Sequence, residues 1–504
     1  MQDFCPVTDA SRKVALIVES PHRDIPGIVL IAHRLCQAGI TCYLVPFPTR
    51  WEEIWALAPD LVLLSNLHRS NASFAKALVQ AGICFGILDT EGGVFTNPDW
   101  YGFIMAQDAQ LRHQAAFYCS WGPYLAEQAV HSGWYLKEQV RVTGTPRTDF
   151  YSADWRVAVL DSSSYAEPYS QGDGMVLLNA NFPAVNPLNF PTEEANIQNR
   201  LLHYEDNRRV ILGYHDIQRE TLRQFVELAN HLAERFPQAH FVYRPHPNER
   251  VEGYQGLLKP YPNLHLIKQG TVEGWIFRAK VVIQRGCSTA IEAGLAGVPT
   301  LSPDWIPCAF EMPTVEEVSV HCLTRQDLEG HLGSILAQRF QIPQEIPRRL
   351  QGIIRDWFFR IDGEAHERVA DHILEHLKGC GHRPRLNKCR DMAYTVGWPM
   401  ERLPSSRWVR MKERGSSLVR RYLGLPAQWS FRNGRRMPRS HWETSGKYFD
   451  DQIVREISGV IHRSTRHAGT NGHAPVGVQL ARERRDYFLD FHGGSVTLFP
   501  SSGS

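Results

Sequence analysis

Residues 241–303 carry the strongest fold signal in the chain; they begin FVYRPHPNER at 241–250 and end, from residue 268 onward, KQGTVEGWIFRAKVVIQRGCSTAIEAGLAGVPTLSP. The apolar run at 241–243 predicts a short buried strand. It leads directly into the cationic corner RPHP at 244–247, where two prolines restrict the backbone. We therefore expect a strand that presents cationic and imidazole side chains at its carboxyl end.

A second strand signal, VVI at 281–283, is followed by the small-residue turn GCST at 286–289 and by a segment with helical spacing at 290–296. Gly297 and the proline two residues later mark the end of that helix. At such strand-turn-helix corners, free N–H groups and the positive end of the helix dipole point at anionic ligands. The two corners together predict a phosphate or pyrophosphate pocket at one sheet edge.

Both corners also have explanations that need no ligand. Thr289 and Glu292 form T-x-x-E, the pattern of a capping box. Arg244 and His246 can simply hold a loop in place. Because both corners would meet at the same sheet edge, the pocket is the simpler explanation, and its predicted residues are Arg244, His246, Ser288, Thr289 and Glu292.

Length and composition limit the possible number of domains and the class of protein. The 504 residues suggest roughly three domain-sized units, and 43% hydrophobic and 11% aromatic residues are ordinary for a globular protein. A formal net charge of +2 gives no sign of nucleic-acid binding by the whole protein. The ten cysteines form no C-x-x-C pair, as expected in a reducing compartment, and we predict no metal site.

The first residues, MQDFCPVTDASRK, lack the basic start and apolar core of a signal peptide, and no apolar run approaches ~18 residues. We expect a cytoplasmic protein. After a tail at 1–12, strand-like runs alternate with helix-like segments, which predicts a doubly wound parallel sheet in a domain at 13–173. The strand-like runs lie at 14–18, 41–46, 61–65 and 84–88.

The run at 84–88 ends in DTEGG at 89–93, two acids and two glycines at the carboxyl end of a strand. If the chain stays extended there, Asp89 and Glu91 point the same way. They are the best candidates for acid, base or nucleophile in this half. The alternative is a helix cap or a solvated turn.

Another strand signal, at 140–143, leads into GTPRTD at 144–149. Arg147 can meet an anion there, or it can pair with Asp149 across the turn. Asp149 is the reserve catalytic candidate because it also follows a strand. The polar stretch at 152–174 is typical of an interdomain linker, and it precedes a second α/β domain at 174–378.

Residues 379–504 form a basic C-terminal extension, in which arginines alternate with tryptophan and tyrosine between 379 and 439. Such a segment can dock on an anionic membrane surface or an acidic carbohydrate. It can also bind nucleic acid or simply be a solvated face. The sequence leaves these alternatives open.

Five motifs in one order give the chain a family resemblance over residues 13–305. They are DTEGG at 89–93, VTGTPRTD at 142–149, LNANF at 178–182, RPHP at 244–247 and GCSTAIEA at 286–293. In this order the chain resembles bacterial surface carbohydrate biosynthesis proteins. More distantly, it is similar to retaining β-Kdo glycosyltransferases and to capsule and teichoic-acid glycerophosphotransferase-like enzymes.

The resemblance implies a glycosyltransferase-B architecture, with two Rossmann-like domains facing each other across a cleft. The nucleotide-sugar would bind the C-terminal domain and the acceptor would face the N-terminal one. By this likeness His246 contacts phosphate, Ser288 and Thr289 supply hydroxyl and N–H donors, and Glu292 takes the ribose. The donor implied is CMP-linked, with a Kdo-like sugar.

The resulting hypothesis is a glycosyltransferase of surface polysaccharide or lipopolysaccharide biosynthesis that needs no cofactor. One of Asp89 and Glu91 would act covalently or as acid/base, and the other would support it. Expected partners are a nucleotide-sugar donor, a glycan or glycolipid acceptor, and the anionic inner face of the membrane in peripheral contact, without nucleic acid. The alternatives are a CDP-polyol phosphotransferase, a two-Rossmann epimerase, and a non-catalytic subunit of a glycan assembly complex.

Overall fold

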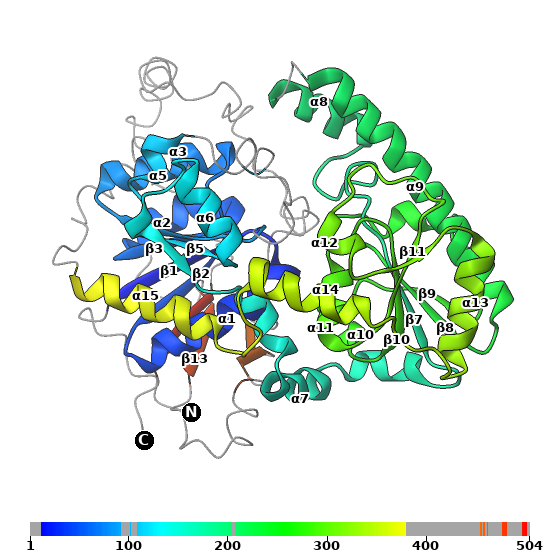
Figure 1. Ribbon diagram of the computed structural model, residues 1–504. Helices are drawn as coiled ribbons and strands as arrows, with labels where there is room; N and C mark the ends of the chain where they lie inside the picture. Colours follow the sequence, from blue (N-terminus) through cyan, green and yellow to red (C-terminus); the bar gives the residue numbers. More distant parts are fainter. Residues whose placement is uncertain are drawn as a thin grey trace, which may run out of the picture.

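A computed structural model describes residues 12–91, 101, 108–203 and 207–379, together with 454, 455, 457, 458, 461, 476–480 and 496–500. Two α/β domains lie next to each other, each built on a sheet with helices packed against it (Figure 1). The predicted fold class, two Rossmann-like domains in a glycosyltransferase-B type arrangement, is confirmed.

The first sheet has the order β13-β14-β2-β1-β3-β4-β5-β6. Its strands run parallel from β2 to β6, whereas β14 is antiparallel to β2 and β13 is antiparallel to β14. The strands are β1 (Lys13–Val18), β2 (Thr41–Pro46), β3 (Leu61–Leu64), β4 (Cys84–Leu88), β5 (Tyr118–Ser120), β6 (Val140–Val142), β13 (Val476–Leu480) and β14 (Val496–Pro500).

The central strands of this sheet are apolar runs because both faces of the sheet are buried, as β1 shows. Leu16 packs into the hydrophobic core on one face of the sheet and Ile17 into the core on the other. A parallel sheet buried on both faces needs apolar residues at every position. The helices of this domain are α1 (Pro21–Gln37), α2 (Arg50–Leu57), α3 (Arg69–Ala81), α5 (Ala109–Arg112) and α6 (Pro123–His131).

The second sheet is parallel throughout, in the order β12-β11-β10-β7-β8-β9. Its strands are β7 (Met175–Asn179), β8 (His240–Arg244), β9 (Leu264–Leu266), β10 (Ala279–Gln284), β11 (Thr300–Pro303) and β12 (Val320–Cys322). Its helices are α8 (Glu193–His203), α9 (Arg208–Arg235), α10 (Val272–Ile276), α11 (Thr289–Ala296), α12 (Pro313–Glu316), α13 (Arg325–Leu336) and α14 (Glu345–Ile353).

The described chain passes between the domains at 152–174 and again ahead of residue 365. The stretch at 152–174, predicted as a linker, is largely helical, with α7 (Ala153–Ser162) and the 3₁₀ segment η4 (Ser164–Ser170). Helix α15 (Ala365–Gly379) returns to the first domain and packs against α1. Strand β14 adds to β2, so part of the chain after residue 378 extends the first sheet.

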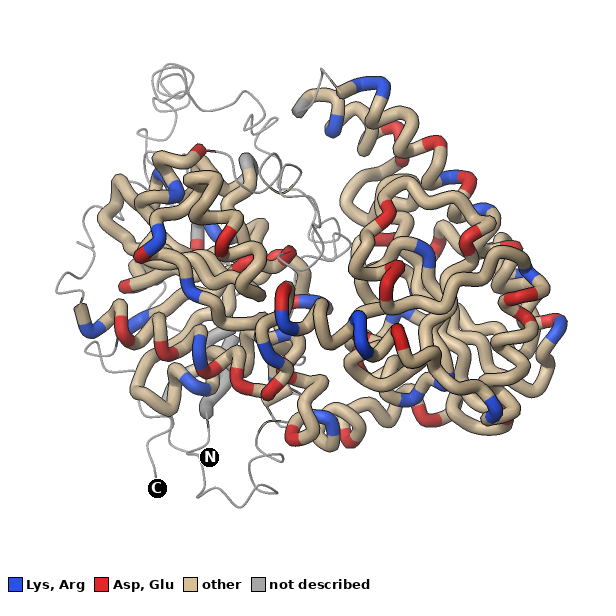
Figure 2. Tube along the Cα trace, viewed as in Figure 1, with Lys and Arg blue, Asp and Glu red and all other residues tan. Residues whose placement is uncertain are grey.

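Lys and Arg positions are interspersed with Asp and Glu along both domains (Figure 2). The basic stretch at 380–439, which carries the membrane hypothesis, lies outside the described residues. Among the residues that the structure describes, no helix combines the length and the apolar character needed to cross a membrane.

Candidate active site

The predicted site residues follow strands of both sheets, and an ion pair joins the two sets. Arg147 lies on the 3₁₀ segment η3 (Pro146–Tyr151), after β6 of the first domain. Its guanidinium donates two parallel hydrogen bonds to Glu292 on α11 of the second domain, at 2.8 and 2.9 Å. The side chains are 20% and 6% exposed. A bidentate, largely buried pair of this kind fixes the approach of two elements.

This pair overturns two local alternatives from the sequence. Arg147 does not pair with Asp149. Thr289 and Glu292 do not form a capping box: Ser288 is the N-cap residue of α11 and makes no side-chain cap bond. Glu292 is instead directed to the other domain.

The approach of Arg147 depends on a glycine in α1. A Cβ atom at Gly27 would lie 2.9 Å from Pro146 Cβ and 3.0 Å from the backbone nitrogen of Arg147. Helix α1 and η3 therefore pack so closely at Gly27 that a larger residue at this position would force one of them to move.

A second acid, Glu273 on α10, belongs to the same cluster. It is buried, and its Oε2 has no hydrogen-bond partner. Desolvation and the charge of Glu292 raise the pKa of Glu273, while Arg147 acts in the opposite direction. The charges of Arg147 and Arg244 both act on these two buried carboxyl groups, and Arg147 alone of the two hydrogen-bonds Glu292 in the described contacts.

His246 lies after β8, and its ring is oriented by its own loop. Nδ1 accepts a hydrogen bond from the backbone N–H of Asn248 at 3.1 Å, which leaves the ring proton on Nε2. Desolvation and the charges of Arg23, Lys268, Arg147 and Arg244 lower the pKa of His246 to about 3. The imidazole is therefore a neutral N–H donor surrounded by cations from both domains.

Arg244 has a definite structural partner. Its guanidinium donates to the carbonyl oxygens of Gln269 at 2.7 Å and Gly270 at 2.5 Å. Burial lowers the pKa of Arg244 to about 10. Arg244 holds the loop after β9, as the ligand-free explanation expected, and its charge still reaches His246.

The GCST turn is held by the LNANF motif, whose role the sequence did not indicate. Asn181 donates to the carbonyl of Gly286 at 2.8 Å, and Asn179 donates to Oγ1 of Thr289 at 3.0 Å. Gly286 has a φ of +66°, which favours glycine. Ser288 and Thr289 are half-buried at the amino end of α11.

Asp89 lies at the end of β4 with its side chain buried. Oδ2 accepts the hydroxyl of Tyr118 at 2.6 Å and the hydroxyl of Tyr101. Oδ1 accepts the N–H of Glu91 at 2.8 Å. The chain bends at this point, so the two acids do not extend side by side as expected. Asp89 is bonded to tyrosines and Glu91 to an arginine.

Glu91 is ion-paired with Arg23 near the start of α1. Desolvation raises the pKa of Glu91, and Arg23 opposes that rise. A pocket opens beside this pair at the carboxyl ends of β1, β3 and β4, and Arg23, Asp89, Trp121 and Arg147 are among the residues that line it. Gly92 and Gly93 of the acid motif lie outside the described residues.

Asp149 has a different environment. Its carboxylate accepts the backbone N–H groups of Ala365 and His366, each at 2.9 Å, and contacts the His366 ring at 2.9 Å. It therefore serves as the N-terminal anion of α15.

The sequence reasoning missed ESPHR at 19–23. It directly follows β1, and Pro21 marks the start of α1. His22 Nδ1 is buried without a partner, and desolvation together with Arg244 and Lys268 lowers the pKa of His22 to about 4. The sequence signal that could have identified ESPHR is the one seen at DTEGG and RPHP: charged side chains directly after an apolar strand.

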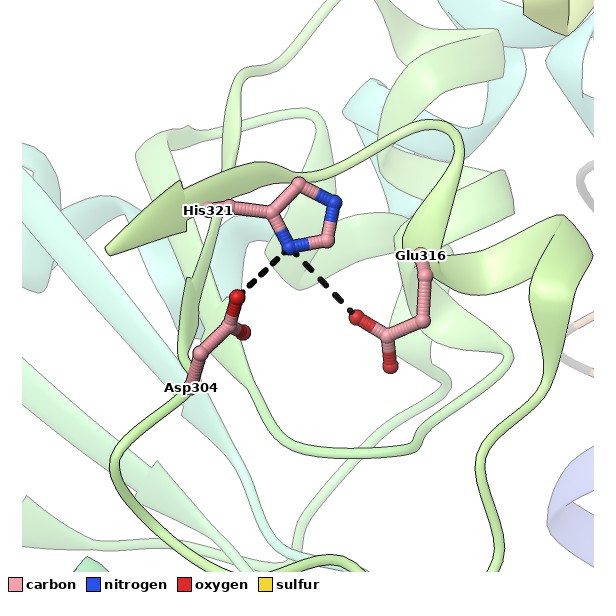
Figure 3. Close-up of side chains that lie close together, drawn as sticks. All are labelled: Asp304, Glu316 and His321. Carbon is pink, nitrogen blue, oxygen red and sulfur yellow. Dashed lines mark hydrogen bonds and ion pairs between the residues drawn. The ribbon is translucent and has the colours of Figure 1, made fainter. Parts of the chain in front are cut away.

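A group of three side chains in the second domain has metal-ligand spacing (Figure 3). His321 Nδ1 lies 2.7 Å from Asp304 Oδ2 and 4.0 Å from Glu316 Oε2. The other oxygen of Glu316 contacts Arg285 at 3.2 Å. Ion pairs within the protein thus already compensate these groups, and we assign no metal to them.

No protein-family model matches the chain, and no curated protein sequence matches it. Solved structures are similar to it at low identity. The Staphylococcus aureus MnaA–UDP structure has a TM-score of 0.48 at 16% identity, over 74% of this chain and 99% of that chain. The Neisseria meningitidis UDP-GlcNAc 2-epimerase bound to UDP-GlcNAc has 0.45 at 14%, over 72% and 100%. A Rickettsia africae glycosyltransferase has 0.39 at 11%, over 73% and 99%.

Proposed function

We propose that this protein is an enzyme that binds a nucleotide-activated sugar between its two domains and transfers the sugar to a glycan or glycolipid acceptor. The observation that carries the proposal is the set of cations around His246. Arg23 and Arg147 come from the first domain, and Arg244 and Lys268 from the second. Arg23 and Arg147 are ion-paired with Glu91 and Glu292, whereas Arg244 and Lys268 bond backbone carbonyl oxygens, so their charge favours an anionic ligand at this position.

The phosphates of the donor fit this position. His246 offers a neutral Nε2–H, and the amino end of α11 offers N–H groups and the Ser288 hydroxyl. The Thr289 hydroxyl donates to Cys287 Sγ at 3.2 Å and would have to turn from it to reach the ligand. In transfer, the sugar–phosphate bond breaks and the electron pair leaves with the nucleotide. Cationic and N–H groups at that phosphate stabilise the developing charge, a role that does not require a metal.

The acids on the other side of the interface supply the remaining chemistry. Glu91, whose pKa is raised by desolvation, suits a group that exchanges a proton with the acceptor hydroxyl. Asp89 would support it or act as nucleophile. Asp149 keeps its place as the reserve candidate, although its bonds to α15 favour a structural role.

The finer identity of the reaction is also a proposal. We assign a CMP-linked, Kdo-like donor and a role in bacterial surface polysaccharide or lipopolysaccharide synthesis on the order of the five motifs. We place the protein in the cytoplasm, with the basic region at 379–439 at the inner face of the membrane. Each basic residue near the anionic surface would contribute about 1 kcal/mol to binding. Co-sedimentation with vesicles should then require anionic lipid and weaken with salt.

The deciding experiment is thermal unfolding of the full chain with CMP-, CDP-, UDP- and GDP-activated donors. A donor at 100 times its Kd should stabilise the protein by about 2.7 kcal/mol. The donor that stabilises is then incubated with and without acceptors. Sugar transfer supports the proposal. Epimerised donor, transferred polyol phosphate, or stabilisation by none of the donors would contradict it.

A further inference from the structure

Glu249, three residues after His246, is completely buried and joins separate segments of the second domain. Its Oε1 accepts the backbone N–H of Phe182 at 2.6 Å and the backbone N–H of His246 at 3.2 Å. Its Oε2 accepts the hydroxyl of Tyr254. One carboxylate therefore ties the loop after β7 to the loop after β8.

The backbone of Glu249 adds a third segment. Its carbonyl oxygen accepts Nζ of Lys268, from the loop after β9, at 2.6 Å. Lys268 is one of the cations whose charge reaches His246. The loops after three neighbouring strands, β7, β8 and β9, thus meet at this residue.

The same contacts determine how His246 is presented. The N–H of His246 is held by the Glu249 carboxylate, and the N–H of Asn248 is thereby directed at Nδ1 of the ring. The loop turns back on itself between these two bonds. With Nδ1 occupied as an acceptor, only the Nε2–H is free to donate.

We propose that Glu249 is the positioning residue of the phosphate site: its carboxylate sets the orientation and tautomer of His246, while its backbone carbonyl oxygen places Lys268. The inference rests on the proposed function for the role of His246 as a phosphate donor group. Glu249 touches neither donor nor acceptor in this account and acts through the loops that it holds.

The surroundings of Glu249 are mainly aromatic, with one nearby cation. Tyr243 and Tyr254 pack beside it, and Lys268 is the cation in reach. Desolvation raises the pKa of Glu249 to about 7, against the hydrogen bonds from Tyr254, Phe182 and His246. Burying an acid without a guanidinium partner is costly, and such groups are retained where they hold a particular geometry.

The test compares three variants of the full chain. Glu249→Ala removes the acceptor of both N–H groups, Glu249→Gln keeps an acceptor oxygen, and Tyr254→Phe removes only the hydroxyl bond. Inorganic pyrophosphate is the probe, measured by calorimetry. We expect about ten-fold weaker binding for Glu249→Ala and binding within about three-fold of wild type for Glu249→Gln and Tyr254→Phe.

The second readout is the His246 imidazole itself, followed by nitrogen NMR of histidine-labelled protein and assigned by its absence in His246→Ala. In wild type the ring should stay in the Nε2–H form and neutral down to about pH 3. In Glu249→Ala its signals should shift toward exchanging tautomers, whereas Glu249→Gln should match wild type.

Unchanged His246 signals in Glu249→Ala would overturn the inference, whatever happens to binding. Equal loss of binding in Glu249→Gln and Glu249→Ala would do the same, because the acceptor oxygen would then not matter. If wild-type protein does not bind pyrophosphate, the proposed phosphate site fails, while the NMR comparison still decides the role of Glu249.

Discussion

Arg147 of the first domain and Glu292 of the second share two parallel hydrogen bonds, Nε to Oε1 at 2.8 Å and Nη2 to Oε2 at 2.9 Å. The family resemblance gives Glu292 to the ribose of the donor. Glu292 can bind the ribose only if the donor displaces Arg147 from its carboxylate. The guanidinium released would then lie beside the donor phosphates, which links donor binding to the contact between the domains.

The first prediction concerns the unequal cost of breaking this pair. Arg147→Met leaves Glu292 buried without its hydrogen-bonded cation, and only the more indirect charge of Arg244 still acts on Glu292 and Glu273, so the variant should destabilise the protein by about 3 to 5 kcal/mol. Glu292→Leu should cost less, because Glu273 still faces Arg147. Urea unfolding at pH 8 measures both.

The penalty of Arg147→Met should shrink at pH 5.5, since Glu273, whose pKa is raised by desolvation and by the charge of Glu292, can then take up a proton. The double variant Arg147→Met/Glu292→Leu serves as the matched control and should recover part of the loss. Strictly additive losses in the double variant would mean that the two side chains are not energetically coupled.

The second prediction is for His246. His246→Ala removes one N–H donor at the phosphate and should weaken donor binding or turnover by ten-fold or more. His321→Ala is the control, because this histidine is in the same domain and its side chain is 44% exposed. Kinetics of His246→Ala that match those of His321→Ala would remove the ring from the site.

The third prediction is a pH dependence of stability due to Glu249. The pKa of this acid is raised from 4.5 to about 7, so the folded protein holds the proton more tightly than the unfolded chain. Its contribution to the free energy of unfolding is therefore largest below pH 4.5 and falls as pH rises to about 7.

Glutamine does not titrate, so the stability of Glu249→Gln relative to wild type should increase across this pH window and level off above it. Denaturant unfolding at several pH values gives the difference directly. A constant difference between the two proteins from pH 4.5 to pH 8 would show that Glu249 has an ordinary pKa.

The strands could be predicted from local sequence because buried parallel strands need unbroken apolar runs, and the two corners because proline or glycine turn residues directly follow a strand. The corner at 286–289 is located as expected. The partners of its residues could not be predicted in the same way. Glu292 has a valid local partner in Thr289, yet it pairs with a residue 145 positions away.

Two other features depend on tertiary packing alone. Asp149 caps a helix that begins more than 200 residues later, and only the return of α15 to the first domain makes this contact. The pairing of β14 with β2 joins residues 496–498 to residues 42–44. Periodicity and turn signals describe neighbours in sequence, so they could not reveal which distant segments meet.

The last prediction separates chemistry from structure at Asp89 and Glu91. Glu91→Gln should lose about 100-fold in turnover, because it removes a proton-exchanging group, while nucleotide binding in the other domain is retained. Asp89→Asn should lose turnover as well, but it also disturbs the bonds from Tyr101, Tyr118 and the N–H of Glu91.

Tyr118→Phe is the matched control for that disturbance, because it removes one hydrogen bond to Asp89 and leaves the carboxylate in place. If Asp89 is a nucleophile or supports one, Tyr118→Phe should keep most of the turnover that Asp89→Asn loses. This difference in turnover should hold even if the two variants lower the melting temperature by similar amounts. Equal losses in these two variants, with full activity in Glu91→Gln, would make the corner structural, and the reacting acid would have to come from another element.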